Sequence, residues 1–266
     1  MVGVKKNRWF APLAIGSVLL FFYLPILIMI IFSFNDSRSL TGWSGFSTQW
    51  YEALLKDREM LKAVYTTIAI ALASTVVATF MGTITAIGIS KSRKLIKELI
   101  LTINNFPILN PEIVTAIGLM LLFSSLSITK GFYTMLIAHI IFSTPYVILS
   151  VLPKLRQLDA DTAEAALDLG ATPWQALFKV IIPQIMPGVV SGALIAFTMS
   201  FDDFVISYFV TGNGVKNISI LVYTMSKRIN PTINALSTIL VVIITFALIL
   251  INVVPNMKKK ERIAVE

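Results

Sequence analysis

The sequence predicts an all-α integral membrane protein with six transmembrane helices. The first reason is composition: 56% of the 266 residues are hydrophobic and only 14% are charged, whereas a soluble domain carries about 25% charged residues. Second, six apolar runs are each long enough to cross a bilayer, which takes about 20 helical residues. Third, neither Lys nor Arg occurs within any of these runs.

The six predicted spans form one membrane domain over residues 1–266. Their approximate bounds are 10–34, 63–90, 99–123, 132–152, 187–210 and 236–255. The first run follows basic residues, as a signal peptide does, but it exceeds the ~7–15-residue apolar region of a signal and has no A-x-A cleavage site. We therefore expect it to be retained as a span. The segment between the first two spans is long enough for a short helix on the membrane surface, with Trp50 and Leu54 on its apolar side.

The basic residues predict the orientation of the chain. With a cytoplasmic N-terminus, most of the 22 Lys and Arg residues fall in cytoplasmic segments, which are the segments that normally carry an excess of them. We therefore expect a multi-pass protein of the cytoplasmic (inner) membrane with both termini in the cytoplasm. The same loops explain the net charge of +8 without a nucleic-acid partner, and the absence of cysteine excludes disulfides and thiolate metal sites.

A polar insert, residues 161–188, separates the fourth and fifth apolar runs. Asp161 and the glutamate three residues later have the spacing of a capping box that begins a helix, and Gly170 is placed to end that helix. A Thr-Pro pair then begins a second helix, and we expect Pro183 and Pro187 to break the chain before the fifth span. The residues alone leave two interpretations open: an amphipathic hairpin at the lipid headgroups, or a docking element for another protein.

Three acids within the predicted spans are candidate ligand-binding residues: Glu112, Asp202 and Asp203. A carboxylate at the centre of a bilayer costs about 2.5–3.5 kcal/mol on insertion scales, and no Lys or Arg lies in a span to offset it. A cationic ligand would supply the missing charge. The alternative is that the acids lie near span ends and are solvated. Pro107 and Pro111 are expected to interrupt the third span before Glu112.

The fifth run carries a small residue at every fourth position, a pattern that lets helices approach closely. The four are Gly188, Gly192, Ala196 and Ser200. A regular helix would place Asp203 on the same side and Asp202 about 100° away. We therefore expect Asp203 to face the ligand pathway or a neighbouring subunit, with Ser200 and Ser207 beside it and with Asp202 reaching the pathway from the flank. Trp50 is a candidate for stacking on a cation or for the aromatic belt, and His139 is expected to pack between helices rather than relay protons.

The spacing within the insert resembles the EAA loop of ABC-importer permeases: E-A-A, three residues, G, nine residues, then I-x-L-P. The matching residues are Glu164, Ala165, Ala166, Gly170 and Pro183, while Val180 and Ile182 replace the usual Ile and Leu. In that family this loop, about residues 159–183 here, is the coupling helix that fits a groove of the ATPase subunit. The resemblance therefore favours the docking interpretation.

The resemblance extends over nearly the whole chain and narrows to the spermidine/putrescine permeases of the PotC-like type. The stretches that carry it are Tyr23–Ile26, Ser33–Asn35, Gln49–Tyr51, Pro111–Val114, Ser200–Asp203 and Phe209–Gly212. It implies the type I ABC importer permease fold and polyamine import by alternating access. It also implies a sibling permease subunit, two ATPase subunits and an extracytoplasmic polyamine-binding protein as partners. The chain has no P-loop, so we expect a transport subunit that is no enzyme and holds no cofactor or metal, with ATP and Mg²⁺ bound by the partner ATPase.

The residues leave other functions open. The same acids would serve a permease for another small cationic solute, or an ATPase-independent secondary transporter or cation channel. A membrane-embedded enzyme is disfavoured, because the chain has one histidine, no cysteine and no HExxH spacing.

Overall fold

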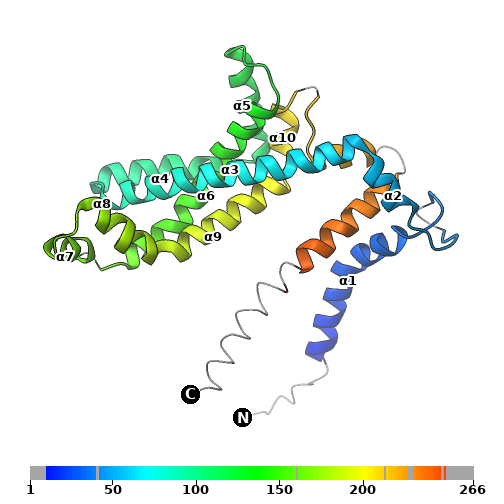
Figure 1. Cartoon of the computed structure of the whole chain (residues 1–266), viewed down its shortest axis with the longest axis horizontal. Helices are drawn as coiled ribbons and strands as arrows, with labels where there is room; N and C mark the ends of the chain where they lie inside the picture. The colour runs from blue at the N-terminus through cyan, green and yellow to red at the C-terminus, as the bar shows by residue number, and fades with distance from the viewer. Residues whose placement is uncertain are drawn as a thin grey trace, which may run out of the picture. The chain divides into compact units, whose positions relative to one another are not determined.

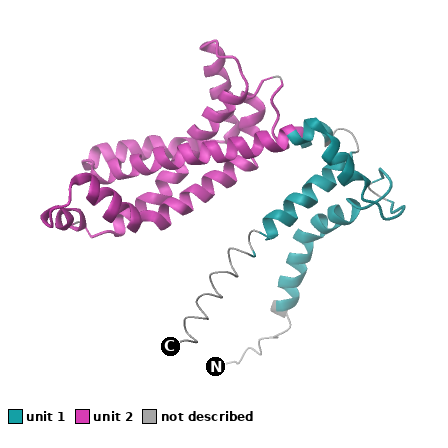
Figure 2. Cartoon of the chain, in the orientation of Figure 1, with its two compact units in different colours: residues 1–61, 222–266 teal, residues 62–221 magenta. Residues whose placement is uncertain are grey.

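Helices are the regular elements of the described part of the chain (Figure 1). The computed structural model describes residues 10–39, 42–159, 161–212, 214–226, 230–246 and 249. The chain divides into two compact units, one of residues 1–61 and 222–266 and the other of residues 62–221 (Figure 2). The all-α class predicted from composition is confirmed.

The first unit contains the first predicted span and the predicted surface helix. Its helices include α1 (Phe10–Phe32) and α2 (Gln49–Lys56), and Thr232–Phe246 forms a further apolar helix. α1 is almost entirely apolar, and its length suffices to cross a membrane. α2 is the short helix predicted between the first two spans. Only the first part of the predicted span 236–255 lies within the described residues.

The second unit contains the principal helix packing. Its elements in chain order are α3 (Arg58–Lys91), α4 (Lys94–Leu109), α5 (Glu112–Ser125), α6 (Phe132–Gln157), α7 (Thr162–Asp168), α8 (Pro173–Gln175), the π-helical segment η1 (Ala176–Ile181), α9 (Ile182–Phe201), α10 (Val205–Val210) and α11 (Ile218–Ser226). The first residues of α3 and the last residues of α11 belong to the first unit. Among the described helices, α6 and α9 form the most extensive contact, and α5 lies beside α10 at one end of the unit (Figure 1). One buried apolar cluster joins α3, α5, α6, α10 and α11, and a second joins α3, α6 and α9.

Four described helical stretches are each long and apolar enough to cross a bilayer. They are Pro12–Phe32, Arg58–Lys91, Phe132–Gln157 and Pro173–Phe201. α4 and α5 pass the same test together, although they are bent by 103° relative to one another. The count of six spans stays a prediction, because the last one is only partly described.

The predicted third span, 99–123, is not one straight helix, because α4 and α5 meet within it at an angle of 103°. Pro111 follows Asn110, whose backbone is extended (φ −81°, ψ 145°). The ring of a proline disfavours helical conformation at the residue before it, which explains the break. Pro107 lies inside α4, so only one of the two prolines expected to interrupt the span does so.

The predicted fifth span, 187–210, has the wrong bounds. Pro183 and Pro187 do not break the chain; both lie within a continuous helical stretch, Pro173–Phe201. Each proline removes one backbone hydrogen bond, and the π-helical segment η1 lies directly before α9 and Pro183. The helix then ends at Phe201, and three residues separate it from α10. The expectation that one regular helix carries both aspartates is therefore wrong.

Small residues allow α9 to approach α6 closely. Gly188, Gly192, Ala196 and Ser200 are all buried. A Cβ atom added to Gly188 would lie 2.9 Å from the backbone oxygen of Ser150, and one added to Gly192 would lie 3.1 Å from Cα of Val147. Both neighbours belong to α6, so the predicted stripe of small residues is the side of α9 that packs on α6.

The variant Gly188→Val should destabilise the contact between α6 and α9. Its side chain would overlap the Ser150 carbonyl, and overpacking of this kind costs about 1–3 kcal/mol. We expect a lower thermal unfolding temperature for the purified protein in detergent. Gly88→Val is the matched control, because a Cβ at Gly88 of α3 meets nothing within 4 Å. Equal unfolding temperatures for the two variants would contradict the close contact.

Candidate functional site

The 159–183 loop begins with a helix that ends at a left-handed glycine. α7 carries the E-A-A residues, and Gly170 follows it with a φ of +85°. The amide of Gly170 donates to the Leu167 oxygen (2.9 Å), and the amide of Ala171 donates to the Ala166 oxygen (3.1 Å). These are the two hydrogen bonds of a Schellman motif. The helix-ending role predicted for Gly170 is confirmed.

Of the two helix caps predicted in this loop, the one at Thr172 is present and the one at Asp161 is not. Thr172 accepts a hydrogen bond from the Gln175 amide (3.3 Å), and its own amide donates to Oε1 of Gln175 (3.0 Å). The cap predicted before Pro173 is therefore confirmed. The box predicted from Asp161 and Glu164 is wrong, because the Asp161 side chain makes no capping hydrogen bond. The Asp161 backbone is already helical (φ −86°, ψ −4°), whereas a capping residue is normally extended.

The loop exposes several large apolar side chains. Leu169, Trp174 and Phe178 are 90%, 69% and 58% exposed, and the rings of Trp174 and Phe178 stack with centroids 5.8 Å apart. Four of the five predicted coupling residues are exposed as well: Glu164, Ala165, Gly170 and Pro183. Exposed apolar surface that is rimmed by polar groups is typical of a site of protein–protein contact.

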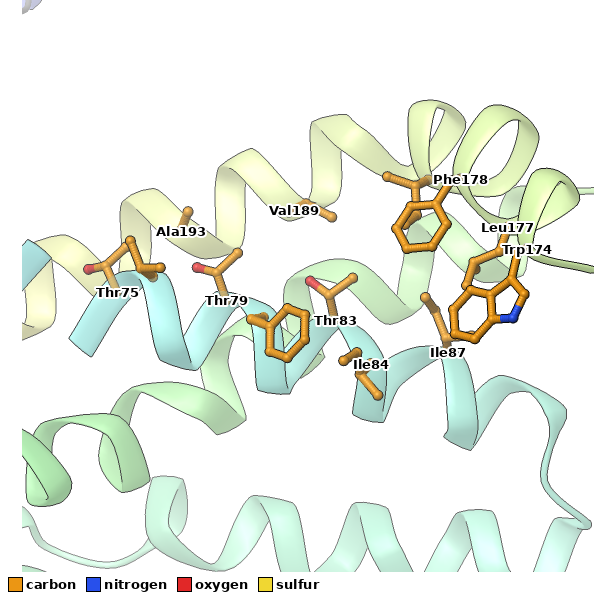
Figure 3. Close-up of a pocket in the computed structure, with 13 residues that line it drawn as sticks. Thr75, Thr79, Thr83, Ile84, Ile87, Trp174, Leu177, Phe178, Val189 and Ala193 are labelled. Carbon is orange, nitrogen blue, oxygen red and sulfur yellow. The ribbon is translucent and has the colours of Figure 1, made fainter. Parts of the chain in front are cut away.

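An apolar groove connects the loop with two long helices (Figure 3). Its volume is about 660 Å³, and its walls come from α3, the loop and α9. Trp174 and Phe178 contribute from the loop, and Thr79 and Thr83 contribute from α3. No lining side chain carries a charge, so the groove does not suit a cationic ligand.

Asp203 lies two residues before α10 (Val205–Val210), the helix that follows the break after α9. Its Oδ1 atom accepts a hydrogen bond from the Ile206 amide (3.2 Å), and its Oδ2 atom accepts from the amide (2.7 Å) and the hydroxyl (2.6 Å) of Ser207. An aspartate that binds the first free amides of a helix is a favourable cap. Asp203 is only 6% exposed, so the carboxylate is enclosed by the protein.

His139 of α6 is a further partner of Asp203. Its Nε2 atom lies 2.9 Å from the Ser207 hydroxyl and 3.3 Å from Oδ2 of Asp203. Its Nδ1 atom lies 2.6 Å from the hydroxyl of Ser200. The expectation that no span residue provides a basic partner for these acids is therefore wrong for Asp203. The expected packing role of His139 is consistent with its exposure of only 2%.

Further polar side chains join the same cluster. Nδ2 of Asn217 donates to the backbone carbonyl oxygen of Asp203 and to the Ser207 hydroxyl, both at 2.9 Å, and its Oδ1 accepts from the Ile220 amide of α11. Ser74 of α3 donates to the Ser200 hydroxyl (3.0 Å). We call this cluster the Asp203 network; its members are Ser74, His139, Ser200, Asp203, Ser207 and Asn217. The network links α3, α6, α9, α10 and the start of α11.

Asp202 and Glu112 are less buried than Asp203. Asp202 is exposed, and Glu112, in the first turn of α5, is half-buried. The Glu112 carboxylate is close enough to Asp203 and Asp202 to interact electrostatically with both. The bend before α5 and the break after α9 therefore bring together the three acids that the sequence singles out.

Trp50 belongs to the first unit, whereas the other four candidate pathway residues belong to the second. Its indole Nε1 donates to the Asn35 carbonyl (2.6 Å), and the neighbouring Tyr51 hydroxyl hydrogen bonds with Oγ of Ser33 (2.7 Å). Stretches 33–35 and 49–51, which both resemble the permease family, are therefore hydrogen-bonded to each other. A role of Trp50 in cation stacking stays a prediction.

Sequence reasoning missed the partner of Asp203. His139 is the only histidine in the chain, and ionisable side chains within spans normally pair with one another, so this rule could have found the pair. The preference of aspartate for helix caps could have indicated a new helix start at Asp203. Asn217 lies outside every predicted span and carries no such signal. Within the described residues, no three His, Asp or Glu side chains gather as possible metal ligands.

The sequence matches a known family and several named proteins. Residues 78–257 match the model of the family described as binding-protein-dependent transport system inner membrane component. The chain is 38% identical over 233 residues to the putrescine transport system permease protein PotI of Escherichia coli K12, covering 83% of this chain and 81% of that protein. It is 38% identical over 224 residues to the spermidine/putrescine transport system permease protein PotC of the same strain, with coverage of 84% and 85%. A PotC homolog of Mycoplasma genitalium is 31% identical over 254 residues.

Two solved structures share the fold. A bacterial ABC transporter involved in the import of the acidic polysaccharide alginate contains a chain with a TM-score of 0.72 and 17% identity, covering 96% of this chain and 99% of that one. The alginate transporter in complex with an alginate pentasaccharide-bound periplasmic protein gives a TM-score of 0.70 at 14% identity, with 93% of each chain covered. At such identities the likeness concerns the fold alone.

Proposed function

Because the chain belongs to the family of binding-protein-dependent transport system inner membrane components, we propose that it is the permease subunit of an ATP-driven importer of polyamines, spermidine or putrescine. As a member of that family, the chain is a membrane-embedded transport subunit and not an enzyme. The substrate class is supported by the relatives, whose names specify putrescine or spermidine and putrescine.

The cluster of three acids at two helix breaks is the observation that carries this proposal. Non-helical backbone at membrane depth is tolerated where it lines a protein-enclosed or watery cavity, so we assign both breaks to the translocation pathway. Glu112, Asp202 and Asp203 bring three acidic side chains to this part of the pathway. A polyamine carries two or more ammonium groups, which matches several neighbouring carboxylates. An anionic substrate would require the opposite charge.

The proposed importer also contains a sibling permease subunit, two ATPase subunits and an extracytoplasmic polyamine-binding protein. The binding-protein partner is supported by the family description and by the structural neighbour that was solved with a periplasmic protein bound. ATP and Mg²⁺ belong to the ATPase subunits, because the sequence of this chain has no P-loop.

A continuous helical stretch connects the proposed ATPase contact with the proposed cation site. Pro173–Phe201 spans 29 residues, roughly 40 Å at the rise of an α-helix. It begins in the 159–183 loop and ends directly before Asp202. When the ATPase subunits close on ATP, they would draw the loop with them, and this helix would carry the displacement to the break. Alternating access of the pathway to the two sides of the membrane would follow.

The orientation of the proposed permease is testable with reporter fusions. The excess of Lys and Arg in alternate loops favours a cytoplasmic location for both termini and for the 159–183 loop. A reporter fused after Lys94 should therefore show cytoplasmic activity, and one fused near Gly45 should show extracytoplasmic activity. A cytoplasmic signal at Gly45 would overturn the orientation.

The variant Gly170→Val should impair coupling to the ATPase. A β-branched residue is strained at a φ of +85°, by roughly 1–2 kcal/mol, so the turn between α7 and α8 would shift. We expect reduced copurification of the ATPase subunits, or ATP hydrolysis that no longer drives uptake. Gly170→Asn is the matched control, because asparagine tolerates the left-handed region. If Gly170→Val assembles and transports like the native chain, the loop does not dock the ATPase through this turn.

Reconstitution with the sibling permease, the ATPase subunits and the binding protein in proteoliposomes tests the function directly. We expect ATP-dependent uptake of labelled spermidine or putrescine. The variants Asp202→Asn and Glu112→Gln should each lower uptake more than tenfold, which corresponds to at least about 1.4 kcal/mol of lost interaction. Asp203→Asn should lower it as well.

Assembly supplies the control for these variants. All three leave the 159–183 loop unchanged, so copurification with the ATPase should stay normal. Near-native polyamine uptake in all three variants at normal expression would show that these acids take no part in transport. Uptake that persists without any ATPase subunit would favour a secondary transporter or channel.

A further inference from the structure

The carboxylate of Asp203 already has protein partners on both oxygens. Oδ1 binds the Ile206 amide, and Oδ2 binds the amide and hydroxyl of Ser207, with His139 close by. A cation that bound at the hydrogen-bonded positions of this carboxylate would displace those bonds. The buried amides and the imidazole would then be left unsatisfied, which is unfavourable. Asp203 is therefore poorly suited to bind a transported cation directly.

His139 is placed to hold both sides of the break between α9 and α10. Its Nδ1 atom contacts Ser200 in the last turn of α9, and its Nε2 atom contacts Ser207 in α10. With a proton on Nε2, the imidazole donates to Ser207 while Ser207 donates to Asp203. One side chain of α6 therefore fixes the end of one helix and the start of the next.

Asp202 is held at the same break but outside the Asp203 network. Its backbone oxygen accepts a hydrogen bond from the Ser219 hydroxyl (3.3 Å), and the residue is exposed. Glu112 is half-buried and lies within electrostatic range of it. The position of the Asp202 carboxylate thus depends on a backbone that the neighbouring network fixes.

We propose that His139 is a positioning residue that, together with Asp203, locks the break between α9 and α10, and that Asp202 and Glu112 are the carboxylates that meet the transported cation. The identity of the cation rests on the proposed function, whereas the lock rests on the geometry alone. This assignment differs from the expectation that Asp203 itself faces the pathway.

Substitutions of His139 separate positioning from packing. His139→Gln keeps an N–H donor near Ser207 and Asp203 and should retain uptake within about threefold of native, whereas His139→Leu has no donor and should lose more than tenfold. Phe142→Leu, another buried α6 position, is the control for a simple loss of packing and should stay near native. Native uptake in His139→Leu, or equal losses in the Gln and Leu variants, would overturn the positioning role.

Cysteine labelling tests the lock without relying on transport. The chain contains no cysteine, so an introduced thiol is its only site for a cationic methanethiosulfonate reagent. In the reconstituted transporter, Asp202→Cys and Glu112→Cys should be labelled, as detected by mass spectrometry of this chain. Ser207→Cys, a near-isosteric change inside the network, should resist labelling. Adding His139→Leu to Ser207→Cys should speed its labelling at least tenfold, and adding His139→Gln should not.

The outcomes distinguish the lock from the proposed substrate. If Ser207→Cys is labelled as fast as Asp202→Cys and putrescine protects both, the network belongs to the pathway and the lock is refuted. If putrescine fails to slow labelling at Asp202→Cys and Glu112→Cys while Ser207→Cys stays resistant, the lock stands and the polyamine assignment fails. Protection at positions 202 and 112, with a resistant position 207, supports both.

Discussion

The carboxylate of Asp203 depends on protein hydrogen bonds, because it is buried at a helix break in a membrane protein. In lipid, a charged group or an open backbone amide has no water to bind, and each unsatisfied group costs several kcal/mol. Asp203 meets both requirements at once. Its carboxylate oxygens accept hydrogen bonds from two amides at the start of α10, and these amides and the Ser207 hydroxyl stabilise the negative charge. His139 then ties this cap to α6.

The two breaks in the second unit arise from different physical causes. Before α5, the ring of Pro111 excludes a helical conformation at Asn110, so the bend follows from sterics alone. After α9, no proline is present, and the break exists because Asp203 offers the next amides a better acceptor than the preceding helical turn does. A steric break requires no support from elsewhere, whereas a break made by hydrogen bonds requires the whole network around it. This difference explains why buried polar side chains from other helices gather at the second break.

Sequence reasoning found features that depend on local chemistry. The left-handed Gly170, the Thr172 cap and the stripe of small residues on α9 each follow from a few neighbouring residues, and the structure has all three. Errors arose where tertiary contacts decide. A helical wheel cannot show that the helix stops before Asp202, and a count of Lys and Arg overlooks a histidine partner. Likewise, Pro183 is a strong local breaker, yet the chain stays helical through it, directly after a π-helical turn.

The contacts around the candidate site differ in kind, and this constrains which helices can move apart. α9 lies against α6 through glycines that leave no space for a side chain, and His139 of α6 also holds the end of α9 through Ser200. Separating α6 from α9 would break the directional hydrogen bond between His139 and Ser200 and would lose the close packing at the glycines. α5, which carries Glu112, meets α10 within a cluster of apolar side chains, and apolar contact is non-directional. A displacement that separates Glu112 from Asp202 therefore disturbs fewer specific contacts than one that separates α9 from α6. The distance between Glu112 and Asp202 is therefore the part of this site that can change at the lowest cost in specific contacts.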